Sequence, residues 1–235
     1  IRVIKAEAEK AGWTAILSER QGFIPHLTLN KNGQSVNITG FGDYRTWEHL
    51  PTDLAQLLSS GKVDIIPWDP LQEKALIAIE DTSATPTGNQ SLQRAERFVA
   101  AAARKIPVVY LLPGAAVKAA DGGVRKPNLW MPICALQLIA RYRSPALIMW
   151  FGDKENPDDK MVGSGTARMK QLMWSSILRA IGESDHIETV IRAQIKDILL
   201  NIDGHYEEIF SAFPGWDSSR IEEWTEAFTR MAMGG

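Results

Sequence analysis

Short apolar runs that alternate with longer helix-forming stretches constrain the fold of this chain more than any other feature. Residues 88–105 contain strong helix formers without an internal breaker, and residues 131–143 resemble a second helix. Because apolar runs stand before, between and after these stretches, the order predicts one α/β sheet, of the α+β mixed type, flanked by helices. The runs of strand length are residues 63–67, 75–79, 108–112 and 145–152.

The first part of the chain predicts a helix and a hairpin. The apolar spacing of residues 1–22 suits an amphipathic helix that ends near Gly22. Residues 23–42 alternate between apolar and polar on both sides of Asn32-Gly33. Since Asn-Gly supplies the positive φ angles of a tight turn, this segment predicts two antiparallel strands.

The pattern after residue 152 is helical. The acidic residues 153–160 are the best candidate for a linker, and the glycine-rich residues 163–168 predict a helix start, because they lack the lysine of a phosphate-binding loop. We therefore expect an α/β core at residues 1–152 and a helical subdomain at residues 153–235, used for recognition or dimerisation. The helical segments are residues 166–182, 186–204 and 220–234.

Composition and charge restrict the class of protein only weakly. Lys and Arg total 26 against 28 acids, and this balance neither indicates nor excludes a polyanionic partner. The single cysteine, Cys134, cannot form an intramolecular disulfide, and no apolar run reaches the roughly 18 residues of a membrane span. We therefore expect a cytoplasmic protein that does not enter a membrane. We interpret the start at Ile1, without an initiator Met, as that of a trimmed or partial chain.

Two acids stand at the ends of neighbouring apolar runs. Asp64 lies near the start of one run and Glu80 directly follows the next. If the turn between them is centred on Gln72, Asp64 lies opposite Glu80 in an antiparallel pair. Opposed residues have Cβ atoms about 4.5–5.5 Å apart on one face, so the carboxylates repel unless a cation lies between them. Mg²⁺, which takes oxygen ligands, fits that requirement.

These residues and elements resemble the core of the PD-(D/E)XK nucleases, which include type II restriction endonucleases. The resemblance covers roughly residues 1–112, or residues 1–152 at its widest. It rests on Asp64, on Glu80-Asp81-Thr82 at the end of a strand, and on the helix and strand that follow. It implies a divalent-metal-dependent endonuclease that hydrolyses phosphodiester bonds of duplex DNA, with Mg²⁺ or Mn²⁺ bound by the two acids. It also implies a prokaryotic restriction or defence role, as a homodimer or as a subunit of a larger defence assembly.

The sequence departs from the family at the lysine that helps to position or deprotonate the attacking water. Thr82 stands at that position. In the register above, Lys62 faces Thr82 across the hairpin, so its amine is our first candidate to replace the family lysine. Gln90 and Gln93, early on the next helix, are the other candidates.

The resemblance further implies a glutamate from the first helix at the metal site, and we expect Glu7 or Glu9 to face the metal. It also implies basic residues along the DNA backbone, whose phosphate contacts position nucleic acid without reading its sequence. The candidates on the helix and on a later loop are Arg94, Arg97, Arg104, Lys105, Lys118, Arg125 and Lys126.

Several alternatives stay open from the sequence. The two acids could cap a strand end and pair with Lys62 or Lys74 without any metal, and Asp43 could be the first acid under another strand alignment. The chain could be a non-catalytic nucleic-acid-binding or assembly module that keeps the fold without activity, which Thr82 favours. It could also be an unrelated α/β enzyme acting on a small phosphorylated substrate.

Overall fold

The computed structural model describes residues 1–20, 24–40, 50–82, 94–114, 116–117, 124–125, 130–152, 159–205 and 215–235. The helices are α1 (Arg2–Lys10), α2 (Thr52–Ser60), α4 (Ala95–Ala103), α5 (Trp130–Tyr142), α6 (Ser164–Ala180), α7 (Ile187–Asp203), the short η2 (Ser218–Arg220) and α9 (Ile221–Ala232). The strands are β1 (Thr14–Arg20), β2 (Ile24–Lys31), β3 (Gln34–Thr39), β4 (Trp68–Asp69), β5 (Lys74–Ala75), β6 (Ala78–Asp81), β7 (Val108–Pro113), β8 (Ala116–Val117), β9 (Val124–Arg125) and β10 (Ala146–Phe151).

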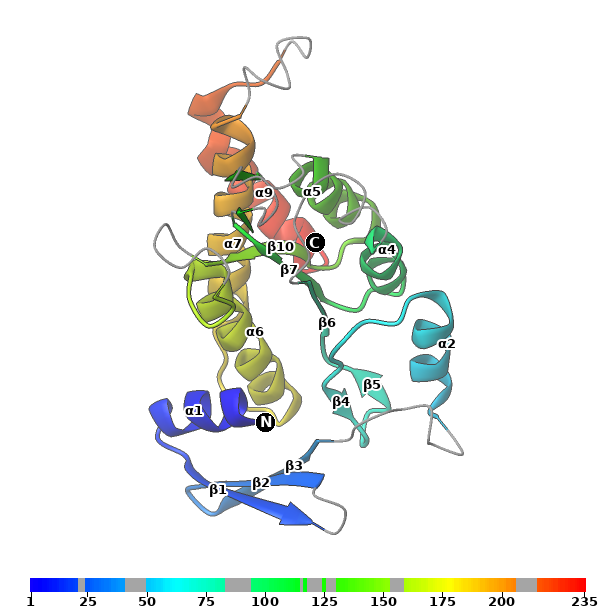
Figure 1. Cartoon of the computed structure of the whole chain (residues 1–235), viewed down its shortest axis with the longest axis vertical. Coiled ribbons are helices and arrows are strands. Elements are labelled where there is room, and N and C mark those ends of the chain that lie inside the picture. The colour runs from blue at the N-terminus through cyan, green and yellow to red at the C-terminus, as the bar shows by residue number, and fades with distance from the viewer. Residues whose placement is uncertain are drawn as a thin grey trace.

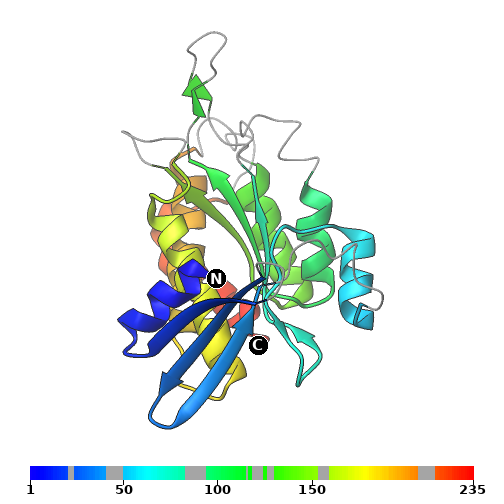
Figure 2. The ribbon, with the colours of Figure 1, turned by 60° about the horizontal axis from the view of Figure 1, so that its bottom comes forward.

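A three-stranded parallel sheet in the order β10-β7-β6 lies between layers of helices (Figure 1). Its strands point the same way, so their carboxyl ends share one edge of the sheet (Figure 2). Helices α4 and α5 connect successive strands, and because such connections are right-handed, both pack against one face. Helix α6 packs against the other face. Strand β7 is buried along its whole length, as expected of a strand between two helical layers, and the predicted mixed α/β class is confirmed. The prediction of one sheet is wrong, because the described strands form four separate sheets and the N-terminal hairpin does not join the parallel one.

The C-terminal helices share the core of the sheet. Leu172 and Trp174 of α6 and Ile195 of α7 belong to the same buried cluster as the parallel strands. The Trp174 ring meets that of Trp13 edge to face, with 6.0 Å between the centroids. The expected boundary after residue 152 therefore falls between two elements that pack together. No described helix combines the length and the apolar character that crossing a membrane requires.

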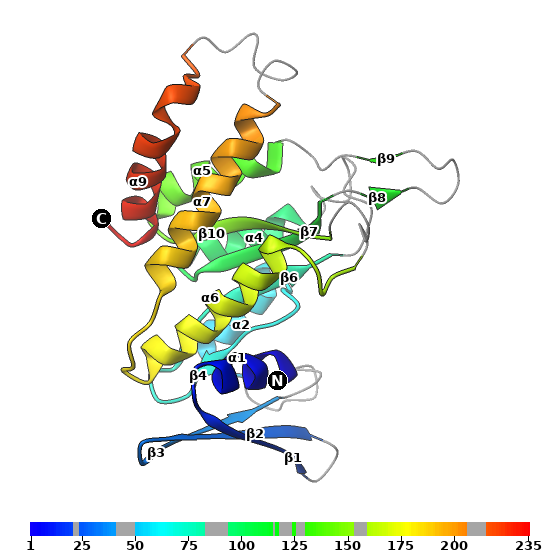
Figure 3. The same ribbon diagram turned by 90° about the vertical axis from the view of Figure 1, so that its left-hand side faces the viewer.

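An antiparallel sheet in the order β1-β2-β3 lies beside α1 (Figure 3). Asn32 and Gly33 connect β2 to β3 with φ angles of 50° and 82°. Both angles are positive, as a two-residue hairpin turn requires, and the predicted hairpin is confirmed.

The predicted first helix is wrong beyond its first half. Helix α1 ends at Lys10, because Gly12 adopts a φ of 80° and the Trp13 N–H donates to the Ala8 carbonyl over 2.9 Å. The chain then reverses into β1, which pairs with β2. Gly12 was the signal for this helix end, and the apolar spacing that continued past it belongs to a strand.

Two glycines allow α6 to start directly against the end of β10. Gly163 has a φ of 102°, and a Cβ atom at Gly165 would clash with the backbone N and O of Trp150. The predicted helix start in this glycine-rich segment is confirmed at Ser164. The turn before α6 is thereby held at the carboxyl edge of the sheet.

Candidate functional site

The two acids predicted to oppose each other do so at the outer side of β6. Ile65 and Ile79 form an antiparallel bridge, with the Ile79 N–H donating to Ile65 over 2.9 Å and the Ile65 N–H donating back over 3.0 Å. This bridge has the predicted register, in which Asp64 lies opposite Glu80. The part of the register prediction that matters for the site is confirmed.

The register shifts by one residue toward the turn. Trp68 pairs with Ala75 and Asp69 pairs with Lys74. The stretch from Ala75 to Ile79 is therefore one residue longer than the stretch from Ile65 to Trp68 that it faces, as in a β-bulge. The prediction of a buried strand at residues 63–67 is wrong in part, because the Ile65 side chain is 48% exposed. This segment lies outside β6 rather than between two strands, so water reaches it.

Glu80 is completely buried and is neutralised by two arginines. Nη1 of Arg97 donates to Oε1 and Oε2 of Glu80 over 2.9 and 3.0 Å. Nη1 of Arg94 donates to Oε1 over 3.0 Å. Charge-assisted bonds of this kind are about twice as strong as neutral ones. The predicted lysine partners of the acid are thus replaced by arginines from the start of α4.

Burial dominates the electrostatics of this carboxyl group. It raises the pKa of Glu80, and the neighbouring Asp64 carboxylate acts in the same direction, against the hydrogen bonds from Arg97 and Arg94. Tyr110 stands beside Glu80 in the β6–β7 register. Burial, reinforced by the Glu80 charge, raises the pKa of Tyr110 to about 12. The two arginines therefore supply the positive charge that offsets the burial of Glu80.

A third pair of charges completes the site. The backbone N–H of Asp81 donates to Oδ2 of Asp64 over 2.8 Å, and the Asp81 carboxylate contacts Nζ of Lys160 at 2.8 Å. The Lys160 carbonyl accepts from the buried Thr166 hydroxyl over 2.9 Å, which fixes the lysine backbone to α6. We call Asp64, Glu80, Asp81, Arg94, Arg97 and Lys160 the β6 cluster.

Lys160 is the member of the β6 cluster that sequence reasoning missed. It belongs to the acidic stretch predicted to be a linker, and its contact with Asp81 spans 79 residues of chain. Its position shortly after β10 was a usable signal, because residues that follow parallel strands gather at one edge of the sheet. Lys160 thus places an ammonium group on Asp81, next to Glu80 in the sequence, and Lys62 as the substitute for the family lysine stays a prediction.

The predicted row of phosphate-binding residues on α4 is divided between its two ends. Arg94 and Arg97 lie at the start of the helix and face Glu80. Arg104 lies at the other end, roughly 15 Å away by the rise of a helix, and donates to the Ser60 hydroxyl over 2.8 Å. Lys105 follows it with a φ of 57°. A continuous basic stripe beside the acids is therefore not formed by these four residues.

The remaining predicted residues stand apart from the acids or are not described. Glu7 accepts from Lys10 over 2.8 Å on α1, and Glu9 likewise pairs with Lys5 on that helix. Among the described residues no three acidic, histidine or cysteine side chains are placed to hold one metal ion, so Glu7 does not join Asp64 and Glu80. Lys62 is exposed, whereas Thr82 is buried and its N–H donates to Leu111 over 3.1 Å. Asp43, Gln90, Gln93, Lys118, Lys126 and the side chain of Arg125 lie outside the described part of the chain.

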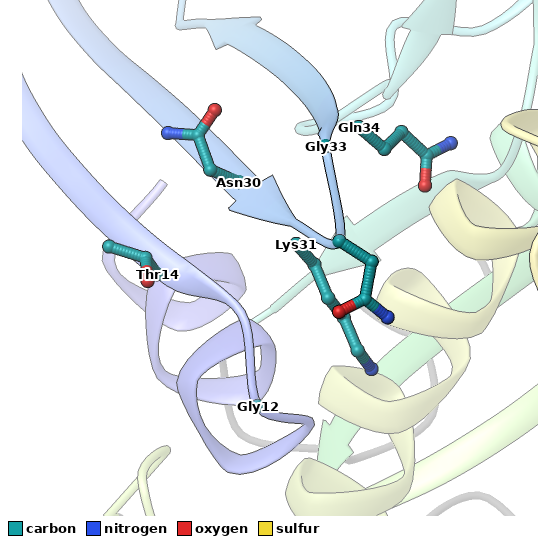
Figure 4. A pocket seen from close by; sticks show the side chains of 7 residues that line it. Gly12, Thr14, Asn30, Lys31, Gly33 and Gln34 are labelled. Atoms are coloured by element: carbon teal, nitrogen blue, oxygen red, sulfur yellow. The ribbon is translucent and has the colours of Figure 1, made fainter.

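A hollow of about 440 Å³ lies elsewhere, at the turn between β2 and β3 (Figure 4). Nζ of Lys31 donates to the Ala11 carbonyl over 2.8 Å and lies 5.8 Å from the centroid of the Trp13 ring, so this lysine joins the hairpin to the end of α1. No carboxylate is among the described residues that line the hollow. Its lining residues are Gly12, Thr14, Asn30, Lys31, Asn32, Gly33 and Gln34.

The donors of the β6 cluster suit a hard cation. Mg²⁺ prefers oxygen ligands and is commonly held by one or two protein carboxylates, with water or phosphate oxygens as its other ligands. Asp64 and Glu80 offer such a pair, provided that Arg94 and Arg97 first leave the Glu80 oxygens. In comparisons with protein-family models, curated proteins and solved structures, nothing matches this chain.

Proposed function

We propose that this chain is a divalent-metal-dependent endonuclease that hydrolyses phosphodiester bonds of duplex DNA. The observation that carries the proposal is the opposition of Asp64 and Glu80 at the carboxyl end of β6, among three basic side chains. The succession of an antiparallel segment, β6, α4 and the parallel β7 supports the resemblance to PD-(D/E)XK nucleases. That order places the acids at the edge of the sheet where α/β proteins commonly bind ligands.

The β6 cluster divides three tasks among its members in this proposal. Asp64 and Glu80 would hold the divalent ion, which would supply an activated water and polarise the phosphate. Arg94 and Arg97 contact phosphate oxygens through their forked donors. Lys160 places an ammonium group beside Asp81, where it stabilises negative charge on the reacting phosphate. Cutting both strands commonly calls for two such sites, so the proposal includes a homodimer.

Cleavage of supercoiled plasmid and mixed genomic DNA in Mg²⁺, Mn²⁺ or EDTA tests the proposed activity. We expect fragments in either metal and none in EDTA. Glu80→Gln and Asp64→Asn should lower the rate more than about 100-fold, the upper end of effects known for residues that only support a metal site. Glu96→Gln serves as the matched control, because Glu96 is an exposed acid on α4, the helix that carries Arg97. Full activity in folded Glu80→Gln and Asp64→Asn variants would exclude this function.

A second candidate is a non-catalytic nucleic-acid-binding module. It is favoured by the hydrogen bonds that occupy both oxygens of Glu80, and by the buried Thr82 at the position of the family lysine. This module would bind duplex DNA with the same affinity in EDTA and in Mg²⁺, and it would cleave in neither. Fluorescence anisotropy with a labelled duplex, run beside the cleavage assay, separates the two candidates.

A further inference from the structure

The β6 cluster is balanced in charge and uneven in exposure. It contains three acids and three bases, so its formal net charge is zero. The Glu80 side chain is 0% exposed, whereas those of Arg94 and Arg97 are 36% and 26% exposed. The guanidinium groups can therefore meet a ligand from solvent, and the carboxylate that they cover cannot.

We propose that Arg94 and Arg97 exchange Glu80 for the phosphates of the nucleic acid, and that this exchange opens Glu80 to the divalent ion. This inference rests on the proposed function. It adds that the metal ion and the nucleic acid bind cooperatively, because each favours the binding of the other. The arginines act as a cover on Glu80 in the free protein and as phosphate ligands in the complex.

The charges explain why one ligand alone binds weakly. A divalent ion that reaches Glu80 alone must push two guanidinium groups off the carboxylate, and it then lies near two unpaired cations. A phosphate that arrives alone draws the arginines away and leaves a buried carboxylate unpaired, which is costly. When both ligands arrive together, every charge gains an opposite neighbour. The ion pairs between Glu80 and the arginines are replaced by metal–carboxylate and arginine–phosphate pairs, so no charge is left without a partner.

The residue types suit such an exchange. An arginine presents several donors in a planar fork that matches carboxylates and phosphates alike, so it can move between them without losing its hydrogen bonds. Arg94 and Arg97 are three residues apart at the start of α4 and are neighbours on one side of that helix. Their side chains can reach an outer ligand by rotation, without any change in the fold.

Coupled binding is measured directly, without turnover. Titration calorimetry gives the affinity of the 235-residue chain for Ca²⁺, the probe ion, with and without a short duplex. Anisotropy gives its affinity for the same duplex with and without Ca²⁺. We expect each ligand to tighten the other about tenfold or more, by equal factors, because coupling between two ligands is reciprocal. Equal Ca²⁺ affinity with and without the duplex would overturn the exchange.

Variants separate the exchange from simple contact between phosphate and metal. Arg97→Gln should reduce the coupling factor at least threefold. Arg94→Gln, the same change at the more exposed arginine, should do so as well. Arg104→Gln, at the other end of α4, should keep it. Coupling that persists in both folded cluster variants would also overturn the exchange. Plasmid cleavage in Mg²⁺ is read separately, so metal-dependent cleavage without coupling would remove this inference and leave the proposed function standing.

Discussion

The two outer strands of the parallel sheet carry polar clusters of different construction. Beside β10, Gln194 of α7 is fully buried, and its Nε2 donates to the Ile148 carbonyl over 2.7 Å. Arg168 donates to Gln194 Oε1 over 3.0 Å and also pairs with Asp197. We call Arg168, Gln194 and Asp197 the β10 cluster. Beside β6, the buried group is a carboxylate, and its partners are the side chains of Arg94 and Arg97.

The difference shows which cluster the fold itself needs. Gln194 satisfies a backbone carbonyl of an outer strand, and covering such a strand protects it from pairing with another chain. Its neutral amide can be buried at low cost once it is hydrogen-bonded. Glu80 is bonded instead to side chains, and burying its charge carries a large desolvation cost that apolar residues of similar size would avoid. We therefore interpret the β10 cluster as a structural element that stabilises the fold, and the β6 cluster as a ligand-binding site.

The largest difference in stability between the clusters should appear when one arginine is removed from each. Arg97→Ala leaves a fully buried carboxylate with one partner, and we expect a loss of about 2–3 kcal/mol in the free energy of unfolding, somewhat below that of a completely buried pair. Arg168→Ala should cost less, about 1–2 kcal/mol, because Asp197 is 34% exposed and can be hydrated, and the buried Oε1 of Gln194 that loses its donor is neutral. Urea unfolding of both variants provides the test, and equal losses would erase the distinction.

Removing the amide of the β10 cluster should affect stability alone. Gln194→Leu leaves the Ile148 carbonyl without its donor, and we expect a loss of about 2 kcal/mol in the free energy of unfolding. The affinity for duplex DNA and for Ca²⁺ should stay unchanged. A change in either affinity in the folded variant would mean that the β10 cluster also contributes to binding.

A carboxylate outside both clusters provides a reference for acid sensitivity. Burial alone would raise the pKa of Asp185, but hydrogen bonds from Arg179 and from the Ile187 N–H lower it below its ordinary value. Its stabilising effect is therefore present at neutral pH and is lost as the pH falls through the pKa of the folded state. Asp185→Asn removes the negative charge that pairs with Arg179 and should cost about 1 kcal/mol at pH 7, the upper end for a partly exposed ion pair. In urea unfolding this difference from the unmodified chain should shrink as the pH is lowered through the acid range, and a constant difference would contradict the assignment.

The smallest effect on stability should come from Lys160. Its side chain is 38% exposed and that of Asp81 is 29% exposed, so their ion pair contributes less than about 1 kcal/mol. Lys160→Ala should nevertheless slow metal-dependent cleavage about tenfold or more, because it removes an ammonium group from the site. Lys160→Arg, which keeps the charge, should recover part of the rate. Unchanged cleavage in the folded alanine variant would remove Lys160 from the site.

The features that the sequence predicts well depend on neighbours along the chain. The hairpin at Asn32-Gly33 follows from local φ angles, and the opposition of Asp64 and Glu80 follows from two nearby segments. Lys160 could not be placed in this way, because its contact with Asp81 depends on how α6 packs against the sheet. The first helix was overextended because its apolar spacing outweighed Gly12, whose positive φ ends the helix.

The partners of Glu80 show a second reason why the sequence predicts the site only in part. The sequence indicates that an acid at the end of a buried strand needs a positive partner, but it does not distinguish a metal ion from a guanidinium group. The sequence predicts Arg94 and Arg97 as contacts to the DNA backbone, because helix periodicity alone does not show how the start of α4 is turned toward β6. Their position emerges only when the helix is packed against the sheet.

Gly165 gives the site a sensitive position that has no chemistry of its own. The space that a Cβ atom would need there is filled by the backbone of Trp150. Any side chain must push the start of α6 outward, and Lys160 moves with it through the Thr166 hydroxyl. A mutational scan scored by cleavage would therefore rank this uncharged residue beside the charged ones. At this position, the absence of a side chain is itself the structural requirement.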